Sequence, residues 1–393
     1  MNSKAWGTVL AFVTVLGLSG GLAWWFNDQA KTQAEPKASS SSVVRQVKPK
    51  KKAKPVVKKV VAKPKPTAAT REIDAVLRAN RFVGTALVVH NNQVIYQKGW
   101  GYADAAAHVK NGPHSVYQLA SVQKSFTAGL IMRLASEGKL NLTDPLSKYY
   151  PTIAGSDQIT LRDMLDMKSG LTLTAFPTKV HSEKGMIKFI LANVISRPDR
   201  IGKWDYAPVN FMLLSGIIAK VSGQSYRHYF TTNITDAWHL KHTGFVFNMN
   251  QQATYSRGYQ NANNADVTAN YGALFGESKE SMYYQFGTGQ VYMSARDLYT
   301  AQRNMLQGQL YPQSDVNVLL VPGSSSMYGG GMYVYPGYIR THGLAYGYEA
   351  TTLLSKDGTD GVVLLSNYYR VNQLSQTPAI QIWNLLQAGE LGK

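Results

Sequence analysis

Cysteine is absent from this chain of 393 residues. Its absence excludes disulfide bonds, thiolate metal sites, a cysteine nucleophile and a lipid-modified N-terminal cysteine. Histidine occurs eight times, but never in the H-E-x-x-H spacing of zinc hydrolases or in another metal-ligating pattern. The sequence therefore predicts neither a metal nor a cofactor, and the chemistry is left to the remaining side chains.

Acidic residues are scarce, with 23 Asp and Glu against 41 Lys and Arg, so the formal net charge is +18. The excess is concentrated near the N-terminus, because residues 1–70 hold 13 Lys or Arg and only Asp28 and Glu35 as acids. Such a distribution is typical of a globular domain preceded by a basic tail.

One long uncharged segment, residues 5–26, precedes the basic tail and ends on three aromatic residues. It is long enough for a helix to cross the hydrocarbon core of a bilayer, and terminal aromatics suit the membrane interface. We therefore expect residues 1–26 to form a retained signal anchor, one transmembrane helix. Cleavage near Gly21-Leu22-Ala23 is the alternative. The few lysines around the segment hardly bias its orientation, so an outside location depends on the chemistry described below.

Residues 27–70 are rich in Lys, Pro, Ala, Ser and Val and contain no aromatic residue. A segment of this composition repels itself and is expected to be a disordered, extended linker. The simpler interpretation is a spacer across a cell wall. The alternative is that its lysines also bind an anionic polymer, which outside a bacterial membrane would be teichoic acid or lipid head groups rather than nucleic acid.

Residues 71–393 have the patterns of one packed domain. Two β-rich runs, 85–90 and 93–98, flank Asn91-Asn92, which predicts a hairpin turn. Further periodic segments predict helices at 71–80, 121–138, 161–167, 210–221 and 295–306, and a strand at 361–366. Strands at both ends with helices between them predict an α+β fold whose terminal segments share one antiparallel sheet.

Ser121 and Lys124 form a Ser-x-x-Lys pair at the start of a predicted helix. The three-residue spacing places both side chains on one helix face. A lysine desolvated in a closed pocket is neutral enough to take the serine proton, and the helix N-terminus favours an oxyanion. On its own the pair is also compatible with a capping serine and a surface lysine.

The blocks around this pair carry a resemblance to a known family. They read YQLASVQKSFTAGLIMRLASEGKLNLTDPLSKYYP, then ITLRDMLDMKSGL, GKWDYAPVNFMLLSGIIAKVSG, GTGQVYMSARDL and GVVLLSN. In this order, over about residues 72–390, the chain resembles the serine β-lactamase and penicillin-binding-protein superfamily, in its class C β-lactamase-like and D-alanyl-D-alanine carboxypeptidase-like branch. The resemblance implies an antiparallel β-sheet flanked by helices, packed against an all-helical subdomain that carries the nucleophile.

The resemblance also implies roles for individual residues. Ser121 and Lys124 fall on the first motif of the family. Tyr206 falls on the tyrosine of the second motif, usually Tyr-x-Asn, where the phenol relays protons to and from the leaving group and water. The backbone N–H groups of Ser121 and Leu344 would form the oxyanion hole, because that role needs no particular side chain.

Two positions depart from the family pattern. The asparagine of the second motif is replaced by Pro208, which offers no side-chain amide. The third motif, usually Lys-Thr-Gly or His-Thr-Gly, aligns with Thr341-His342-Gly343, so a threonine stands where the cation is expected. In the family that lysine binds the terminal carboxylate of the substrate. These three residues are candidates for substrate binding, but recognition of a peptide C-terminus should be poor.

Three functions are compatible with these residues. The first is a D-alanyl esterase that removes D-alanine from (lipo)teichoic acid through an acyl-Ser121 intermediate; the chain looks like the D-alanyl-lipoteichoic-acid esterases of lactobacilli. Such a substrate has a free ammonium and no terminal carboxylate, which fits Thr341. The second is a D,D-carboxypeptidase, which would need Arg340 or His342 to hold a carboxylate, although Arg340 should point to the other face of its strand. The third is a catalytically silent wall-binding protein.

The esterase interpretation predicts a location and partners. We expect a single-pass protein of a Gram-positive cell membrane, with an extracellular catalytic domain that acts on an anionic wall polymer. Residues 327–338 (MYGGGMYVYPGY) precede the third motif and are rich in tyrosine. They predict either ordinary sheet packing or an open aromatic cleft for a long polymer.

Overall fold

The computed structural model describes residues 67–261, 271–370 and 373–391. The chain divides into two units, residues 1–63 and 64–393, and everything described belongs to the second. The predicted anchor at residues 5–26 and the predicted linker up to residue 66 lie outside the described residues. Within the described ranges, no helix combines the length and the hydropathy that a membrane span requires.

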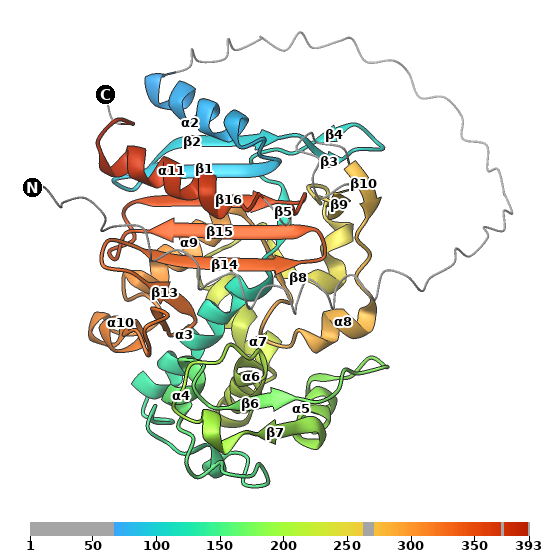
Figure 1. Cartoon of the computed structure of the whole chain (residues 1–393), viewed down its shortest axis with the longest axis vertical. Helices are drawn as coiled ribbons and strands as arrows, with labels where there is room; N and C mark the ends of the chain where they lie inside the picture. The colour runs from blue at the N-terminus through green and yellow to red at the C-terminus, as the bar shows by residue number, and fades with distance from the viewer. Residues whose placement is uncertain (1–66, 262–270, 371–372, 392–393) are drawn as a thin grey trace, which may run out of the picture. The chain divides into compact units, whose positions relative to one another are not determined.

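An antiparallel sheet of seven strands forms the centre of the domain (Figure 1). Its strands, in spatial order, are β12 (Tyr328–Gly329), β13 (Met332–Val334), β14 (Ile339–Ala345), β15 (Tyr348–Leu354), β16 (Gly361–Ser366), β1 (Gly84–His90) and β2 (Gln93–Trp100). The first strand of the chain therefore lies beside the last, with Thr85 opposite Leu365. The predicted α+β fold with a shared terminal sheet is confirmed.

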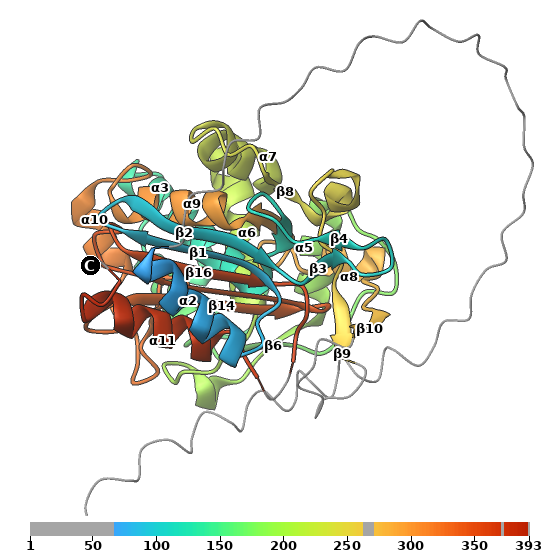
Figure 2. The ribbon, with the colours of Figure 1, turned by 90° about the horizontal axis from the view of Figure 1, so that it is seen from above.

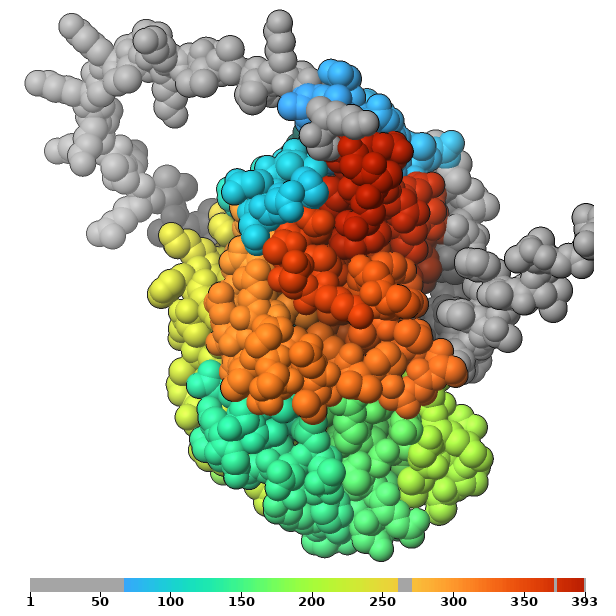
Figure 3. Space-filling model, turned by 90° about the vertical axis from the view of Figure 1, so that its left-hand side faces the viewer, coloured from blue at the N-terminus to red at the C-terminus, as the bar shows by residue number. Residues whose placement is uncertain are grey.

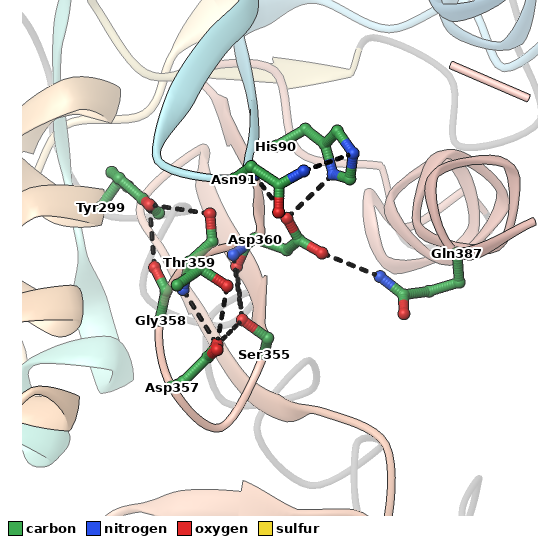
Figure 4. Close-up of polar contacts among 9 residues, drawn as sticks. All are labelled: His90, Asn91, Tyr299, Ser355, Asp357, Gly358, Thr359, Asp360 and Gln387. Carbon is green, nitrogen blue, oxygen red and sulfur yellow. Dashed lines mark hydrogen bonds and ion pairs between the residues drawn. The ribbon is translucent and has the colours of Figure 1, made fainter. Parts of the chain in front are cut away.

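The predicted hairpin between β1 and β2 is also confirmed. Asn91 and Asn92 both have positive φ, 49° and 63°, as a two-residue turn requires. At the same end of the sheet, the loop between β15 and β16 is fastened to this turn (Figure 4). Asp360 accepts hydrogen bonds from the backbone N–H of Asn91 at 2.9 Å and pairs with the imidazole of His90 at 3.0 Å. These contacts hold two distant parts of the chain together.

Helices cover both faces of the sheet, as the view from above shows (Figure 2). One face packs on α2 (Ala68–Ala79) and α11 (Gln376–Gln387), and the other packs on α3 (Gln123–Ser136) and α9 (Ala295–Leu306). Alternation along β1 explains both contacts, because Ala86 and Val88 face the first helix layer while Leu87 and Val89 face the second. The two layers enclose separate hydrophobic cores.

A helical region adjoins the α3 side of the sheet (Figure 1). It contains α4 (Leu161–Leu165), α5 (Glu183–Asn193), α6 (Val209–Ser222), α7 (Tyr226–Phe230) and the small hairpin of β6 (Leu171–Leu173) and β7 (Val194–Ser196). The space-filling view shows the same division, with the green atoms of this region below the orange and red atoms of the sheet (Figure 3). The all-helical subdomain implied by the resemblance is thus present, with one small hairpin added.

The other elements connect these two parts. They are β3 (Tyr102–Asp104), β4 (Val109–Lys110), β5 (Val116–Gln118), β8 (Thr243–Phe245), β9 (Tyr259–Asn261), β10 (Tyr271–Leu274), α8 (Lys279–Tyr284), β11 (Val291–Ser294) and α10 (Gln313–Leu319). The three-stranded sheet β5-β11-β8 matters most for function, because β5 leads directly into the segment that carries Ser121.

Element boundaries differ from the predictions in two informative places. Helix α2 begins at Ala68 rather than at residue 71, because the Thr67 hydroxyl caps it by accepting from the backbone N–H of Thr70. Helix α4 ends at Leu165 rather than at residue 167, because Met167 has a φ of 57° and turns the chain out of the helix. Strand β16 and helix α9 have the predicted bounds.

Candidate active site

Ser121 lies in a 3₁₀ turn, η1 (Ala120–Val122), between β5 and α3. The prediction that it opens an α-helix is therefore wrong by half a turn. Leu119 ties this segment to β11 by donating its N–H to the Val291 carbonyl at 2.8 Å. Ala120 has a φ of 47°, which is costly for a residue with a β-carbon. The backbone thus holds Ser121 at a sharp bend, and its hydroxyl caps neither η1 nor α3.

Lys124 lies in the first turn of α3, with its Nζ 2.8 Å from the Oγ of Ser121. The residue is only 1% exposed, and burial lowers the pKa of its ammonium to about 7. No carboxylate within the described ranges forms an ion pair with it. Without a counter-charge, desolvation favours the neutral amine, which can accept the proton of Ser121.

Tyr206 faces the same two residues from the loop that precedes α6. The Nζ of Lys124 lies 5.1 Å from the centre of its ring. Burial raises the pKa of its phenol to about 12, and a hydrogen bond with Ser121 opposes that effect in part. The phenol therefore remains protonated at neutral pH and can pass a proton on. The structure brings together the three residues predicted to be catalytic.

The tyrosine-rich segment at 327–338 supports this group from behind. Tyr328 is 2% exposed, and its ring meets that of Tyr206 edge to face, with centroids 5.9 Å apart. Tyr333 makes a similar contact with Tyr328 at 5.1 Å. Such contacts fix the orientation of Tyr206. They favour the interpretation of this segment as sheet packing.

Pro208 stands immediately before α6, as the last residue outside the helix. Its carbonyl accepts from the N–H of Phe211 and of Met212, so it only starts the helix. Asn210, the next amide along the chain, is buried and donates to the carbonyl of Ala207 at 3.0 Å. The second motif therefore contributes its tyrosine to the site but no amide at the usual position.

Gly343 contacts the nucleophile segment closely. A β-carbon on Gly343 would lie 2.3 Å from the carbonyl oxygen of Leu119 and 2.8 Å from the backbone nitrogen of Ser121. No side chain fits there, which supports the alignment of Thr341-His342-Gly343 with the third motif. The alternative alignment, with His342 first, would place Leu344 at the position of the motif's glycine.

Thr341 shares a strand face with Gly343 and is 3% exposed. Its hydroxyl lies 2.6 Å from the hydroxyl of Thr352 and accepts from the Nε2 of Gln302 at 3.1 Å. The place of the family's cation is thus filled by a neutral, fully bonded hydroxyl. Gln302, on α9, was not singled out in the sequence, because nothing in a helical stretch indicates which residue will reach a distant strand.

The two cationic candidates beside Thr341 point elsewhere. The Nε2 of His342 lies 2.9 Å from Glu349, whose carboxylate also accepts from the N–H of Ser375. Arg340 donates to Gln376 at 2.9 Å at the start of α11, as its strand position predicts. The structure therefore does not bring the imidazole of His342 to Ser121, contrary to its inclusion among the candidate substrate-binding residues.

The N–H of Leu344 is the predicted second oxyanion donor, and its direction can be inferred from the turn that follows it. Strands β14 and β15 are joined by the two-residue turn Tyr346-Gly347, in which both residues have positive φ. The residues that flank such a turn form a hydrogen-bonded pair and the pattern alternates, so we expect Leu344 to direct its N–H away from β15. Strand β13 covers only the first two residues of β14, which leaves this edge open beside Ser121.

Glu277 is a further acidic residue close to this group that the sequence did not reveal. It accepts a hydrogen bond from the amide of Gln285 and interacts with Gln118, three residues before Ser121. Its only sequence signal is that it is one of few acids in a basic chain. Among the residues that the structure describes, no group of three or more metal-binding side chains is found.

Comparisons with known proteins agree with this geometry. Residues 69–387 match the family model described as Beta-lactamase. A Bacillus subtilis protein named penicillin-binding protein PbpX is 33% identical over 312 residues, which are 79% of this chain and 77% of that protein. The Staphylococcus aureus teichoic acid D-alanine hydrolase is 27% identical over 281 residues, 70% of this chain and 68% of that one.

Solved structures give the same fold. The crystal structure of FmtA from Staphylococcus aureus superposes with a TM-score of 0.71 at 25% identity, covering 81% of this chain and 88% of FmtA. The D-amino acid amidase of Ochrobactrum anthropi, at 18% identity, superposes with a TM-score of 0.68 and covers 82% of this chain and 100% of its own. At that lower identity the likeness concerns the fold alone.

Proposed function

The chain belongs to the β-lactamase and penicillin-binding-protein family of serine hydrolases, and from this we propose that it is a D-alanyl esterase of the cell envelope that acts on (lipo)teichoic acid. One observation carries the choice of substrate: the buried Thr341 hydroxyl, bonded to Thr352 and Gln302, occupies the place of a carboxylate-binding cation. An esterified D-alanine has no free carboxylate and does not need that cation. The similarity to teichoic acid D-alanine hydrolase supports the same substrate.

Acylation begins at the pair of Ser121 and Lys124. The Oγ of Ser121 attacks the ester carbonyl carbon while the neutral Nζ of Lys124, 2.8 Å away, takes its proton. The negative charge on the carbonyl oxygen is held by the N–H groups of Ser121 and Leu344. Collapse of the tetrahedral species breaks the bond to the polymer hydroxyl, whose oxygen receives the proton from Lys124 through Tyr206. The product is D-alanyl-Ser121.

Deacylation reverses these roles. Lys124 and Tyr206 take a proton from water, whose oxygen attacks the acyl carbon of D-alanyl-Ser121. The ester bond to Oγ then breaks and Oγ regains a proton, which releases D-alanine and restores the enzyme. Because the pKa of Tyr206 is raised to about 12, the phenol acts as a relay and Lys124 as the base.

We also propose that residues 1–26 anchor the protein in the cell membrane, with the catalytic domain outside. The support is the uncharged run at 5–26 and the extracellular location of the proposed substrate. Residues 27–70 would then span the distance to the polymer.

Fractionation of cells that produce the full chain or a chain lacking residues 1–26 tests this anchor. The full chain should sediment with membranes and be cut by protease added to whole cells. Recovery of the full chain in the soluble fraction would refute it.

A second candidate is a D,D-carboxypeptidase acting on peptidoglycan stems. The similarity to a penicillin-binding protein favours it, whereas the engagement of His342 with Glu349 and of Arg340 with Gln376 argues against it. A silent wall-binding protein is disfavoured by the contact of Ser121 with Lys124.

The deciding experiment incubates the full chain with D-alanylated lipoteichoic acid and, separately, with a muropeptide ending in D-Ala-D-Ala, and measures the D-alanine released. We expect release from lipoteichoic acid alone. Ser121→Ala should abolish it while the thermal unfolding midpoint stays close to that of the parent. Release from the muropeptide alone would establish the carboxypeptidase, and undiminished activity of Ser121→Ala would remove Ser121 as the nucleophile.

A further inference from the structure

Glu277 lies between the two segments that supply the oxyanion donors. On one side it interacts with Gln118, the last residue of β5 and three residues before Ser121. On the other side lies Tyr346, two residues after Leu344, whose phenol pKa is raised by burial and by the neighbouring Glu277 carboxylate. Gln118 ends the strand that leads into Ser121, and Tyr346 follows the strand that carries Leu344. The carboxylate therefore lies beside both segments of the site.

Gln285 connects Glu277 to the bend that carries Ser121. Its Nε2 donates to the Oε1 of Glu277. Its own Oε1 fills the space beside Gly289, since a β-carbon there would lie 2.1 Å from it and 3.4 Å from the Cα of Ala120. Any side chain at position 289 would therefore collide with the Gln285 amide. The Gln285–Glu277 pair thus lies beside the residue that directly precedes the nucleophile.

The charge of Glu277 has no cationic partner within the described ranges. Its hydrogen-bond partners, Gln118 and Gln285, are neutral amides. Burial raises the pKa of its carboxyl well above the ordinary value. Asp74, by contrast, contacts Lys98 at 2.8 Å and Arg78 at 3.5 Å. A partly buried carboxylate without a counter-ion is unfavourable, and a bound cation would relieve it.

Tyr346, beside this carboxylate, belongs to a group of aromatic rings. Tyr346 meets Phe275 edge to face, with centroids 5.6 Å apart, and hydrogen-bonds to Ser281 on α8. Tyr284, at the end of α8, packs against Phe176 at 4.6 Å, and the pKa of its phenol is raised by burial and by the neighbouring Tyr346. Aromatic faces around an anion attract an organic ammonium and exclude competing water.

We propose that Glu277, held by Gln285 and flanked by Tyr346, is the subsite for the α-ammonium of the acyl group, so that the enzyme selects aminoacyl esters over simple acyl esters. The subsite rests on the proposed function, because a D-alanyl ester carries its ammonium one carbon from the carbonyl that Ser121 attacks. In contrast to a carboxypeptidase, which holds its substrate by a carboxylate, this enzyme would hold the acyl part by its positive charge.

The test uses two esters with the same leaving group, 1-O-D-alanylglycerol and 1-O-propionylglycerol, which differ only in the ammonium. The parent enzyme should prefer the alanyl ester. Glu277→Gln removes the charge but keeps the shape, and should lower kcat/KM for the alanyl ester about 10- to 100-fold. Hydrolysis of the propionyl ester should be unchanged, which shows at the same time that the variant is folded. Glu280→Gln, three residues further along in the first turn of α8, is the matched control and should change neither rate.

Equal loss on both esters, or no loss on either, would overturn the ammonium subsite. Glu277→Asp should retain part of the preference, because it keeps the charge; a preference as low as that of Glu277→Gln would also contradict the proposal. The two proposals can fail separately. If the parent releases no D-alanine from lipoteichoic acid but Glu277→Gln still loses only the alanyl ester, the polymer assignment fails and the subsite stands.

Discussion

The α-carbon of Gly343 lies so close to the backbone nitrogen of Ser121 that a β-carbon on the glycine would be 2.8 Å from that nitrogen. The same β-carbon would be 2.3 Å from the Leu119 carbonyl. Both neighbours are backbone atoms, so Gly343→Ala must push β14 away from the nucleophile. We expect an activity loss of about 100-fold on the best substrate, because a displacement of about 1 Å misplaces the oxyanion donors.

Gly337→Ala is the matched control for this variant, because nothing lies within 4 Å of a β-carbon at that position. It should leave both the rate and the unfolding midpoint unchanged. Gly343→Ala should also lose about 1–3 kcal/mol of unfolding free energy through overpacking. Full activity of Gly343→Ala would show that the approach of β14 to Ser121 is not needed for turnover.

The pH dependence of the rate should report the amine of Lys124. Since burial lowers its pKa to about 7, the neutral base predominates only above that pH. The kcat/KM should therefore rise with pH and level off above about pH 8, with an apparent pKa near 7 in the free enzyme. If kcat/KM instead rose with an apparent pKa near 10, Lys124 would be charged in the resting enzyme and could not be the base.

Lys124 should also cost stability. Its pKa is lowered on folding from 10.5 to about 7, so between these values the unfolded chain binds more protons than the folded one. The unfolding free energy therefore rises with pH across that window, and the destabilisation by Lys124 is largest at neutral pH and below. Lys124→Met removes the buried ammonium, and chemical denaturation at pH 7 should show a gain of about 2–4 kcal/mol together with loss of activity.

The exposed Lys356→Met is the control for that comparison. It should change the unfolding free energy by less than about 0.5 kcal/mol at any pH. The difference between Lys124→Met and the parent should shrink steadily from pH 7 to pH 9. A constant difference would indicate a packing effect of methionine rather than relief of a buried charge.

Asp360 should contribute to stability without affecting catalysis. It fastens the β15–β16 loop to the turn at His90 and Asn91 (Figure 4). This loop lies at the opposite end of β16 from Ser366. Asp360→Ala leaves these donors without their acceptor and should cost about 1–2 kcal/mol in thermal or chemical unfolding. The rate on the proposed substrate should be unchanged. Asp157→Ala, at an exposed position, should change neither quantity.

Features encoded by neighbouring residues could be predicted from the sequence. The run at 361–366 is a continuous apolar strand, the Asn-Asn pair needs positive φ, and the spacing of Ser121 and Lys124 places them together on adjacent turns. The pairing of the first and last strands followed from the order of the elements. In each case, a local pattern or a short spacing determines the geometry.

Features that depend on distant residues could not be predicted. Gln302 reaches Thr341 from a separate helix, and Glu277 reaches the site from a segment without any motif. The bend at Ala120 was missed as well, because nothing in an Ala-Ser-Val sequence indicates a positive φ that only the surrounding contacts impose. The direction of His342 depends on Glu349, which faces it from the next strand.

The pairing of β1 with β16 has a consequence for how the domain is made. The strand that opens the domain finds its partner only near the end of the chain, so the central sheet cannot close on a growing polypeptide. Contacts of such long sequence separation form slowly, because the loop between them must be ordered first. A ribosome-bound chain would therefore remain without its complete sheet, and shortening it before β16 should leave β1 with an unpaired edge that favours aggregation.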